Sequence, residues 1–232
     1  MTRQRLRRLY FTSATESIEL QYEPLVAQAP ESLRPQGEMS PHSFDVTIDG
    51  EIVGNGVDQG GKATITGLPA GKKTMEVWLP HASPVTLLSL AIDAGTTAVI
   101  EPDPRPVWLT YGSSLTHCTR AHSPACTWPA LVARQHKLHL VSLGFGGDCH
   151  MEPMLAFHIR SVKADYITMK LGINTLSTLG ARTCKSHWGG THTDAVLAAS
   201  LLLLSAALPV STCLLLLRFM SPQARNQHTG LA

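Results

Sequence analysis

Apolar strand patterns that alternate with helical patterns in the middle of the chain constrain its fold more than any other feature. The segment "VWLTY" (107–111) is a continuous apolar run, as in a parallel strand that is covered on both faces. Two further strands are predicted at "LHLVSLGF" (138–145) and "DYITMKLG" (165–172). The helical patterns "TWPALVARQHK" (127–137) and "EPMLAFHIRSVK" (152–163) separate these strands. This alternation predicts βαβ units and a parallel sheet.

Local signals support both helices. Thr127 is a candidate N-cap, and Pro129 lies in the first turn, where a missing N–H costs little. The second helix is expected to carry an apolar stripe made of Met154, Leu155, His158, Ile159 and Val162.

The chain before the first of these strands has a different pattern. Residues 44–100 contain short segments of alternating polarity, such as "FDVTIDGE", in which Asp49-Gly50 marks a tight turn. Short strands at this spacing predict a small antiparallel β-sandwich. The proline-rich segment "EPDPRP" (101–106) is interpreted as a linker. We therefore predict a β-sandwich domain with its linker at 1–105, a partial α/β domain at 106–180, and an unassigned apolar tail at 181–232.

Composition excludes several classes of function. The net charge is +2 and only 16% of residues are charged, so nucleic acid is not expected as a partner. The cluster of Arg3, Arg5, Arg7 and Arg8 is interpreted as a solvated or frayed terminus, and no apolar segment of a secretion signal follows it. Five cysteines, an odd number without tight spacing, argue against a disulfide framework and suit a reducing compartment. A cytoplasmic location is expected.

Metal-binding residue types gather after each of the first two strands of the α/β pattern. They are His117, Cys118, His122, Cys126, Cys149 and His150. No pair of cysteines has the close spacing of a zinc site, so no metal is expected and the cysteines are interpreted as free and buried.

Marked residues follow each of the three α/β strands. Gly112 comes before Ser113 and Ser114, and a small residue there allows a sharp turn that exposes a serine hydroxyl. Gly147 offers an open backbone N–H, and Asn174 offers a side-chain amide. Sites in such sheets form at the carboxyl ends of the strands, and this set provides half of an acyl-transfer site.

The three motifs together resemble the SGNH (GDSL-type) hydrolase superfamily, in a subgroup with an N-terminal β-sandwich. "GSSLT" (112–116) resembles the first block, with Ser114 as the nucleophile. "GFGGDC" (144–149) resembles the second, with Gly147 as an oxyanion donor, and "GIN" (172–174) the third, with Asn174 as the other donor. The resemblance implies an α/β fold, the flavodoxin-like three-layer SGNH hydrolase fold, which is incomplete here.

Two departures from the family pattern stand out. Ser113 replaces the usual acid of the first block. No Asp-x-x-His motif is present; His192, in "WGGTHTDA" (188–195), falls where the base would fall, but Gly189 stands in place of the acid. His192 is also interpretable as an ordinary loop histidine, Ser114 and Asn174 as helix caps, and the glycines as a turn.

The apolar stretch 195–217 contains no charged side chain and has three interpretations. It is long enough for a membrane helix, since ~20 residues span a bilayer, and Arg218 and Arg225 follow it. A core helix is the second, although Pro209 would interrupt it. The favoured interpretation is a shifted reading frame or a retained intron, because the family pattern stops at about Leu176.

The resemblance implies a serine esterase or acyltransferase that acts on a small-molecule or glycan ester through an acyl-serine. Ser114 would attack, His192 or another histidine would take its proton, and the N–H groups of Ser114 and Gly147 with the Asn174 amide would hold the oxyanion. This chemistry needs no cofactor, so none is expected. Without a complete base and orienting acid we expect weak or no activity. The alternative is a non-catalytic binding protein or a tail-anchored membrane protein. The sequence does not specify the acyl group, the alcohol or the oligomeric state.

Overall fold

The computed structural model of the chain describes residues 7–24, 42–56, 58–174 and 214–218. The chain divides into two compact units, the first formed by residues 1–105 and 117–142, the second by residues 106–116 and 143–232. The segment 117–142, which includes the first predicted helix, therefore groups with the N-terminal part of the chain. The limits expected for the α/β domain and for the tail stay predictions.

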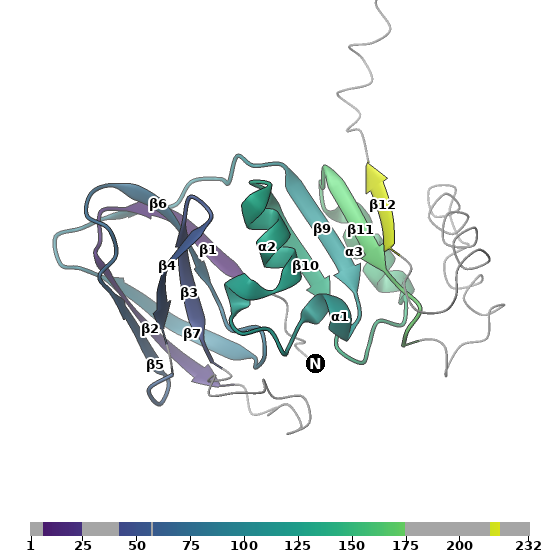
Figure 1. Ribbon diagram of the computed structural model, residues 1–232, viewed down its shortest axis with the longest axis horizontal. Helices are drawn as coiled ribbons and strands as arrows, with labels where there is room; N and C mark the ends of the chain where they lie inside the picture. Colours follow the sequence, from purple (N-terminus) through teal and green to yellow (C-terminus); the bar gives the residue numbers. More distant parts are fainter. Residues whose placement is uncertain (1–6, 25–41, 57, 175–213, 219–232) are drawn as a thin grey trace, which may run out of the picture. The chain divides into compact units, whose positions relative to one another are not determined.

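The first unit contains two antiparallel sheets (Figure 1). The larger sheet has the order β4-β3-β6-β1-β8 and consists of β1 (Arg8–Ser13), β3 (Phe44–Ile48), β4 (Glu51–Gly56), β6 (Lys73–Trp78) and β8 (Ala98–Val99). The smaller sheet has the order β5-β2-β7 and consists of β2 (Ser17–Pro24), β5 (Lys62–Thr66) and β7 (Val85–Ile92).

Alternation along the strands gives both sheets an apolar face. In β5, for example, Ala63 and Ile65 are buried while their neighbours in the strand are exposed. Strands of both sheets contribute to one hydrophobic core, which includes Phe11, Ile18, Leu20, Phe44, Val46, Ile65, Met75 and Val77. Each large apolar side chain buried in this way contributes ~1.5–3 kcal/mol, so this core accounts for the main stabilisation of the first unit.

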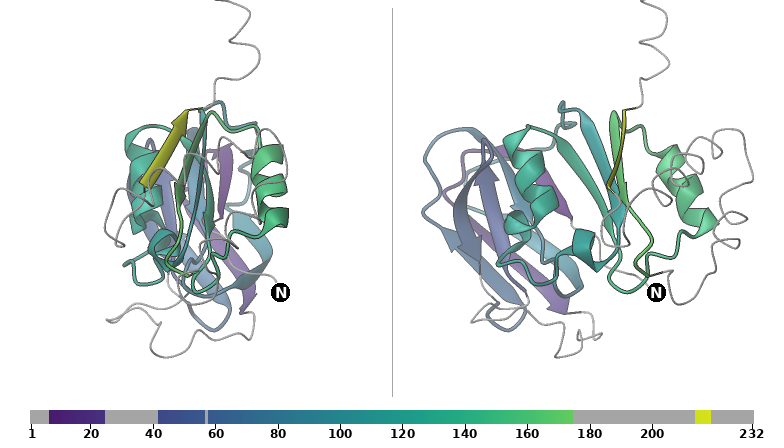
Figure 2. Two further views of the ribbon diagram at one scale, coloured as in Figure 1. Left: turned by 90° about the vertical axis from the view of Figure 1, so that its right-hand side faces the viewer. Right: turned by 45° about the vertical axis from the view of Figure 1, so that its right-hand side comes forward.

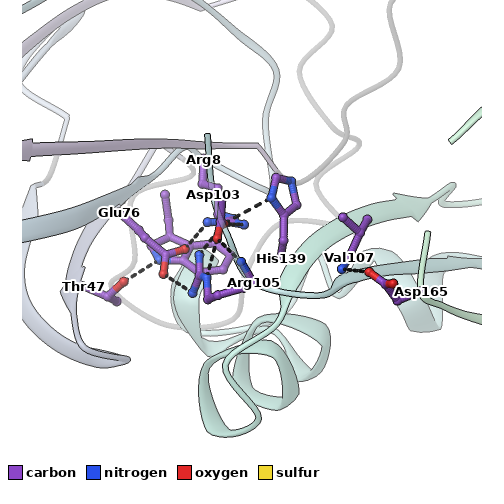
Figure 3. A network of polar contacts seen from close by, with 9 residues as sticks. Arg8, Thr47, Glu76, Asp103, Arg105, Val107, His139 and Asp165 are labelled. Atoms are coloured by element: carbon purple, nitrogen blue, oxygen red, sulfur yellow. Dashed lines mark hydrogen bonds and ion pairs between the residues drawn. The ribbon is translucent and has the colours of Figure 1, made fainter. Parts of the chain in front are cut away.

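The interpretation of the N-terminal arginines as a solvated terminus is wrong for Arg8. Arg8 begins β1, and its guanidinium, only 7% exposed, forms ion pairs with Glu76 and Asp103. Arg105 binds the same two carboxylates, through Nη1 to Glu76 at 2.7 Å and through Nε to Asp103 at 2.8 Å (Figure 3). Burial raises the pKa of Asp103, but hydrogen bonds from Arg105 and Arg8 outweigh burial and hold that pKa well below its ordinary value.

The helix predicted after Thr127 forms in the first unit as α2 (Trp128–Gln135). Thr127 is its N-cap and accepts the N–H of Ala130 at 3.4 Å, while Pro129 lies in the first turn. A short 3₁₀ helix, η2 (Pro124–Cys126), precedes it. The cap and the proline were therefore correctly predicted from local sequence.

The second unit is built around a four-stranded sheet with the order β10-β9-β11-β12. Its elements are β9 (Val107–Gly112), α1 (Ser114–His117), β10 (His139–Gly144), α3 (Pro153–Ser161), β11 (Tyr166–Lys170) and β12 (Leu214–Arg218). β9 and β11 pair in parallel, as the βαβ pattern predicts, and β11 and β12 pair in antiparallel fashion. The second unit contains the last residues of β10.

The stripe predicted for the helix at 152–163 is only partly correct. α3 lies on one side of the sheet (Figure 2), and of its residues Ile159 alone is fully buried. Met154 is 77% exposed, and His158 is exposed as well. A helix of nine residues covers little of a sheet, so only one residue of the stripe is fully buried, and Met154 and His158 stay in solvent.

Five residues of the apolar tail form a strand of the second unit's sheet. Leu214–Arg218 forms β12, which pairs with all of β11 from Tyr166 opposite Arg218 to Lys170 opposite Leu214. Residues 195–213 lie outside the described residues, so the three interpretations of that segment stay predictions. Among the described residues, no helix has the length and apolarity needed to cross a membrane.

Two histidines of the first unit, the buried His81 and the half-buried His117, are in contact. His81 is 3% exposed, and its carbonyl oxygen lies 2.9 Å from His117 Nε2. Burial, followed by the proximity of His117, lowers the pKa of His81 from 6.5 to about 4. Burial also lowers the pKa of His117. Both imidazoles are therefore neutral at pH 7.

We expect the free energy of unfolding to decrease as the pH falls from about 6.5 to about 4. The unfolded chain takes up a proton on His81 at its ordinary pKa of 6.5, whereas the folded chain resists protonation until about pH 4. The contribution of neutral His81 to the free energy of unfolding is therefore fully present above pH 6.5. The loss from His81 is on the order of 3 kcal/mol, to be measured by urea denaturation across this range. His81→Leu should flatten the dependence and His136→Leu, at an exposed position, should not; equal slopes in both variants would contradict the assignment.

Candidate active site

The two serines after β9 have different environments. Ser113 is fully buried, its Oγ accepts the N–H of Leu115 at 3.4 Å, and its carbonyl accepts the N–H of Thr116 at 2.9 Å. Ser114 is the first residue of α1 and is exposed. The turn therefore uses the first hydroxyl to hold the helix and presents the second to solvent.

Gly112, the last residue of β9, leaves no room for a side chain. A Cβ added there would lie 2.2 Å from Thr116 Oγ1 and 3.0 Å from the carbonyl oxygen of Lys170. The chain can thus turn from β9 into α1 only because this position has no Cβ.

The loop that carries Gly147 is attached to the same residue. The N–H of Phe145, directly after β10, donates to the carbonyl oxygen of Gly112 at 2.8 Å. The N–H of Asp148 donates to the carbonyl of Phe145 at 3.3 Å and closes a turn. Gly147 is exposed in this turn and has φ +77°, a backbone conformation that favours glycine.

The third strand end is also next to Gly112. Lys170, at the end of β11, pairs with Gly112, and the half-buried Asn174 follows in a turn. The structure therefore brings Ser114, Gly147 and Asn174 to three strand ends that meet at one edge of the second unit's sheet. His192 lies outside the described residues.

A buried tyrosine, which the sequence pattern identifies only as part of a strand, supports this edge. Tyr111 Oη accepts the N–H of Met151 at 3.2 Å and lies 3.4 Å from Glu152 Oε2. The ring of Phe145 packs edge-on against Tyr111 at 6.0 Å between centroids. A tyrosine inside an apolar strand needs a partner for its hydroxyl, which is the signal that could have identified Tyr111. These contacts hold both ends of the Gly147 loop.

The cysteine of this loop is not suited to nucleophilic attack. Cys149 is 1% exposed, and burial raises the pKa of its thiol to about 11. Because the thiolate is the nucleophile, Cys149 is inert at neutral pH. The exposed Ser114 hydroxyl is the better candidate.

Asp148 and His150 form a pair directly after Gly147. The distance from His150 Nδ1 to Asp148 Oδ1 is 4.0 Å, and both side chains are partly exposed. In the sequence, His150 stands out only as a candidate metal ligand. Within the described part of the chain, no group of three or more His, Cys, Asp or Glu side chains could hold a metal ion.

Comparison with known proteins gives two kinds of match. The model of the GDSL-like Lipase/Acylhydrolase family matches residues 105–178. Among solved structures, the salicylyl-acyltransferase SsfX3 from a tetracycline biosynthetic pathway is similar, with 32% identity, a TM-score of 0.62 and coverage of 73% of this chain and 49% of that one. No curated protein matches the sequence.

More distant structures share the fold. A putative GDSL-like lipase from Bacteroides ovatus has 17% identity and a TM-score of 0.61, with coverage of 82% of this chain and 56% of that one. A family two carbohydrate esterase from Clostridium thermocellum, in complex with cellohexaose, has 14% identity and a TM-score of 0.52, with coverage of 87% and 67%. The chain spans about half the length of the first two of these three structures.

Replacement of Gly112 tests the steric constraint at the strand end. We expect Gly112→Ala to lower the free energy of unfolding by ~1–3 kcal/mol, because the new methyl overlaps Thr116 Oγ1. Adding Thr116→Ala should recover part of the loss, since that change removes the nearest atom. Chemical denaturation of the two single variants and the double variant measures the coupling. Strictly additive losses would show that the overlap is not the cause.

Proposed function

Because this chain is a member of the SGNH (GDSL-type) hydrolase superfamily, we propose that it hydrolyses a carboxylic ester, or transfers its acyl group, through an acyl-serine at Ser114. The observation that carries the proposal is the position of Gly112, which is bonded to Phe145 and paired with Lys170. Three strand ends with a hydroxyl, a backbone N–H and an amide therefore lie next to one another.

The proposed chemistry follows from these groups. Ser114 Oγ attacks the ester carbonyl carbon, and the alcohol leaves with the proton that the serine gave up. The N–H groups of Ser114 and Gly147 and the amide of Asn174 stabilise the negative oxygen of the tetrahedral intermediate. Loss of one such donor typically costs ~10²–10³ in rate. Water then releases the acyl group in hydrolysis, and a second alcohol does so in acyl transfer.

The base is proposed to be His192, by its position in the family pattern. His150 is a second candidate, because Asp148 faces its Nδ1 and leaves Nε2 for the serine. The distance of 4.0 Å is long, but such contacts often shorten only when substrate binds. The long contact agrees with the expectation of low activity.

The substrate class is proposed from the similar proteins. One is named a salicylyl-acyltransferase and another a carbohydrate esterase, so a small-molecule or a glycan ester is proposed here. We further propose that the first unit contains the N-terminal β-sandwich domain and that the protein acts in the cytoplasm. The two sheets with one common core support the first of these points.

Substitution of the two adjacent serines separates catalysis from structure. Ser114→Ala should reduce hydrolysis of a short-chain nitrophenyl ester to the uncatalysed background, because the nucleophile is removed. Ser113→Ala should retain most of the rate and lose ~1 kcal/mol of stability, because only the cap of α1 is removed. Initial rates and chemical denaturation of both variants are the measurements. Equal rates for Ser114→Ala and the unaltered protein would remove the support for an esterase.

Two histidine variants identify the base. We expect His192→Gln to abolish the Ser114-dependent rate and His150→Gln to change it less. The rate should be measured across pH, because a variant that lacks the catalytic base loses the pH dependence that the titration of this base gives to the rate. Labelling of Ser114 by a fluorophosphonate should follow the same order. The reverse order would assign the role to His150 and Asp148.

A further inference from the structure

A cavity of about 330 Å³, lined mostly by polar and charged residues, lies within the first unit, and the proposed chemistry does not use it. Its floor is the outer face of the five-stranded sheet. Glu76 pairs with Thr47 of β3 on one side and with Tyr10 of β1 on the other, so these three residues form one row across the sheet. Thr74 lies two residues before Glu76 and therefore faces the same way.

This floor is polar although it is buried. Thr47 is not exposed at all, and Glu76 is 6% exposed. Thr47 Oγ1 accepts the indole N–H of Trp78 at 2.9 Å, and Glu76 pairs with Arg8 and Arg105 (Figure 3). The charge of Glu76 is thus compensated inside the protein.

The rim of the cavity comes from the end of α2 and from the turn between β3 and β4. Arg134 donates from Nε to the carbonyl of Gly50 at 2.7 Å and from Nη1 to that of Ala125 at 2.8 Å. A Cβ at Gly50 would lie 3.2 Å from the carbonyl oxygen of Arg134, so the turn and the helix are closely packed. Asp49 and Lys137, both exposed, have φ of 51° and 52° and complete the rim.

The rim carries an uncompensated positive charge. Arg134 binds only carbonyl oxygens, and within the described residues neither it nor Lys137 forms an ion pair with a carboxylate. Asp49 supplies one negative charge against these two cations. A ligand that suits the cavity therefore has one negative group for the rim and hydroxyls for the floor.

We propose that this cavity binds a small, hydroxyl-rich carboxylate, namely an acidic sugar of the uronate type. The carboxylate contacts Arg134 and Lys137, and the sugar hydroxyls contact the half-buried Thr74 and Tyr10. The volume is at the lower end of the ~300–1,000 Å³ of ligand pockets, which suits a single sugar unit. The site does not depend on Ser114, so binding is separable from catalysis.

Isothermal titration calorimetry tests the proposal, with the full chain carrying Ser114→Ala to prevent turnover. The probe is sodium galacturonate, and galactose is the neutral match that lacks the carboxylate. We expect galacturonate to bind with a dissociation constant on the order of 1 mM, roughly tenfold tighter than galactose. Equal affinities, or no binding of galacturonate up to about 50 mM, would overturn the proposal.

Charge variants on the rim locate the site. Lys137→Asn should weaken binding of galacturonate roughly fivefold, and Asp49→Asn should strengthen it, because each changes the charge by one unit. Asparagine tolerates the positive φ of both positions, and circular dichroism checks that the variants fold. Lys72→Asn, at an exposed lysine outside the cavity, should leave the affinity unchanged. Unchanged affinity in both rim variants would exclude this cavity as the site. The binding measurement does not depend on the outcome of the ester assay, so the two proposals can fail separately.

Discussion

The missing side chain at Gly112 is the constraint on which the rest of the candidate site depends. The carbonyl of this residue accepts a bond from the loop after β10, and its backbone pairs with the end of β11. Thr116 Oγ1 occupies the space that a Cβ would need. One position therefore joins three strand ends and also allows the sharp turn that leaves Ser114 exposed. A larger residue would disturb all three loops together.

The five-stranded sheet of the first unit illustrates how one pattern creates two different surfaces. Met75 and Val77 of β6 enter the hydrophobic core, while Thr74 and Glu76 face the opposite side. That opposite side is covered as well, because Asp45 Oδ2 accepts the N–H of Ala125 in η2 at 2.8 Å. A covered polar face must satisfy its own groups, which explains the ion pairs around Glu76.

These ion pairs are better understood as positioning contacts than as a source of stability. Burial of charges costs free energy that the attraction between them recovers only when the geometry is good. Here Arg105 contacts two carboxylates and also lies over the ring of Tyr10, with 5.3 Å from Cζ to the ring centroid. The network therefore holds the linker segment near Arg105 against the sheet and shapes one wall of the cavity.

Much of the secondary structure followed from local patterns. The parallel strands, the cap at Thr127 and the family motifs after each strand were all predicted from neighbouring residues. β1 and β2 were not predicted. β2 carries a local signal, the alternation of Ile18, Leu20 and Tyr22, which are buried. β1 was missed because Arg8 looked like part of a charged terminus. Its burial depends on Glu76 and Asp103, which are 68 and 95 positions away, and no local pattern contains that information.

The sequence by itself determined the order of strands and helices between residues 107 and 172 and the chemistry available after each of these strands, because these depend on the period of side chains and on residue type. Only the tertiary structure decided that Ser113 is buried while Ser114 is exposed, and that the polar side of β6 faces a cavity. The physical reason is the separation along the sequence: a helix or strand pattern depends on residues that are a few positions apart. The environment of a side chain depends on segments that pairing and packing bring together from distant parts of the chain.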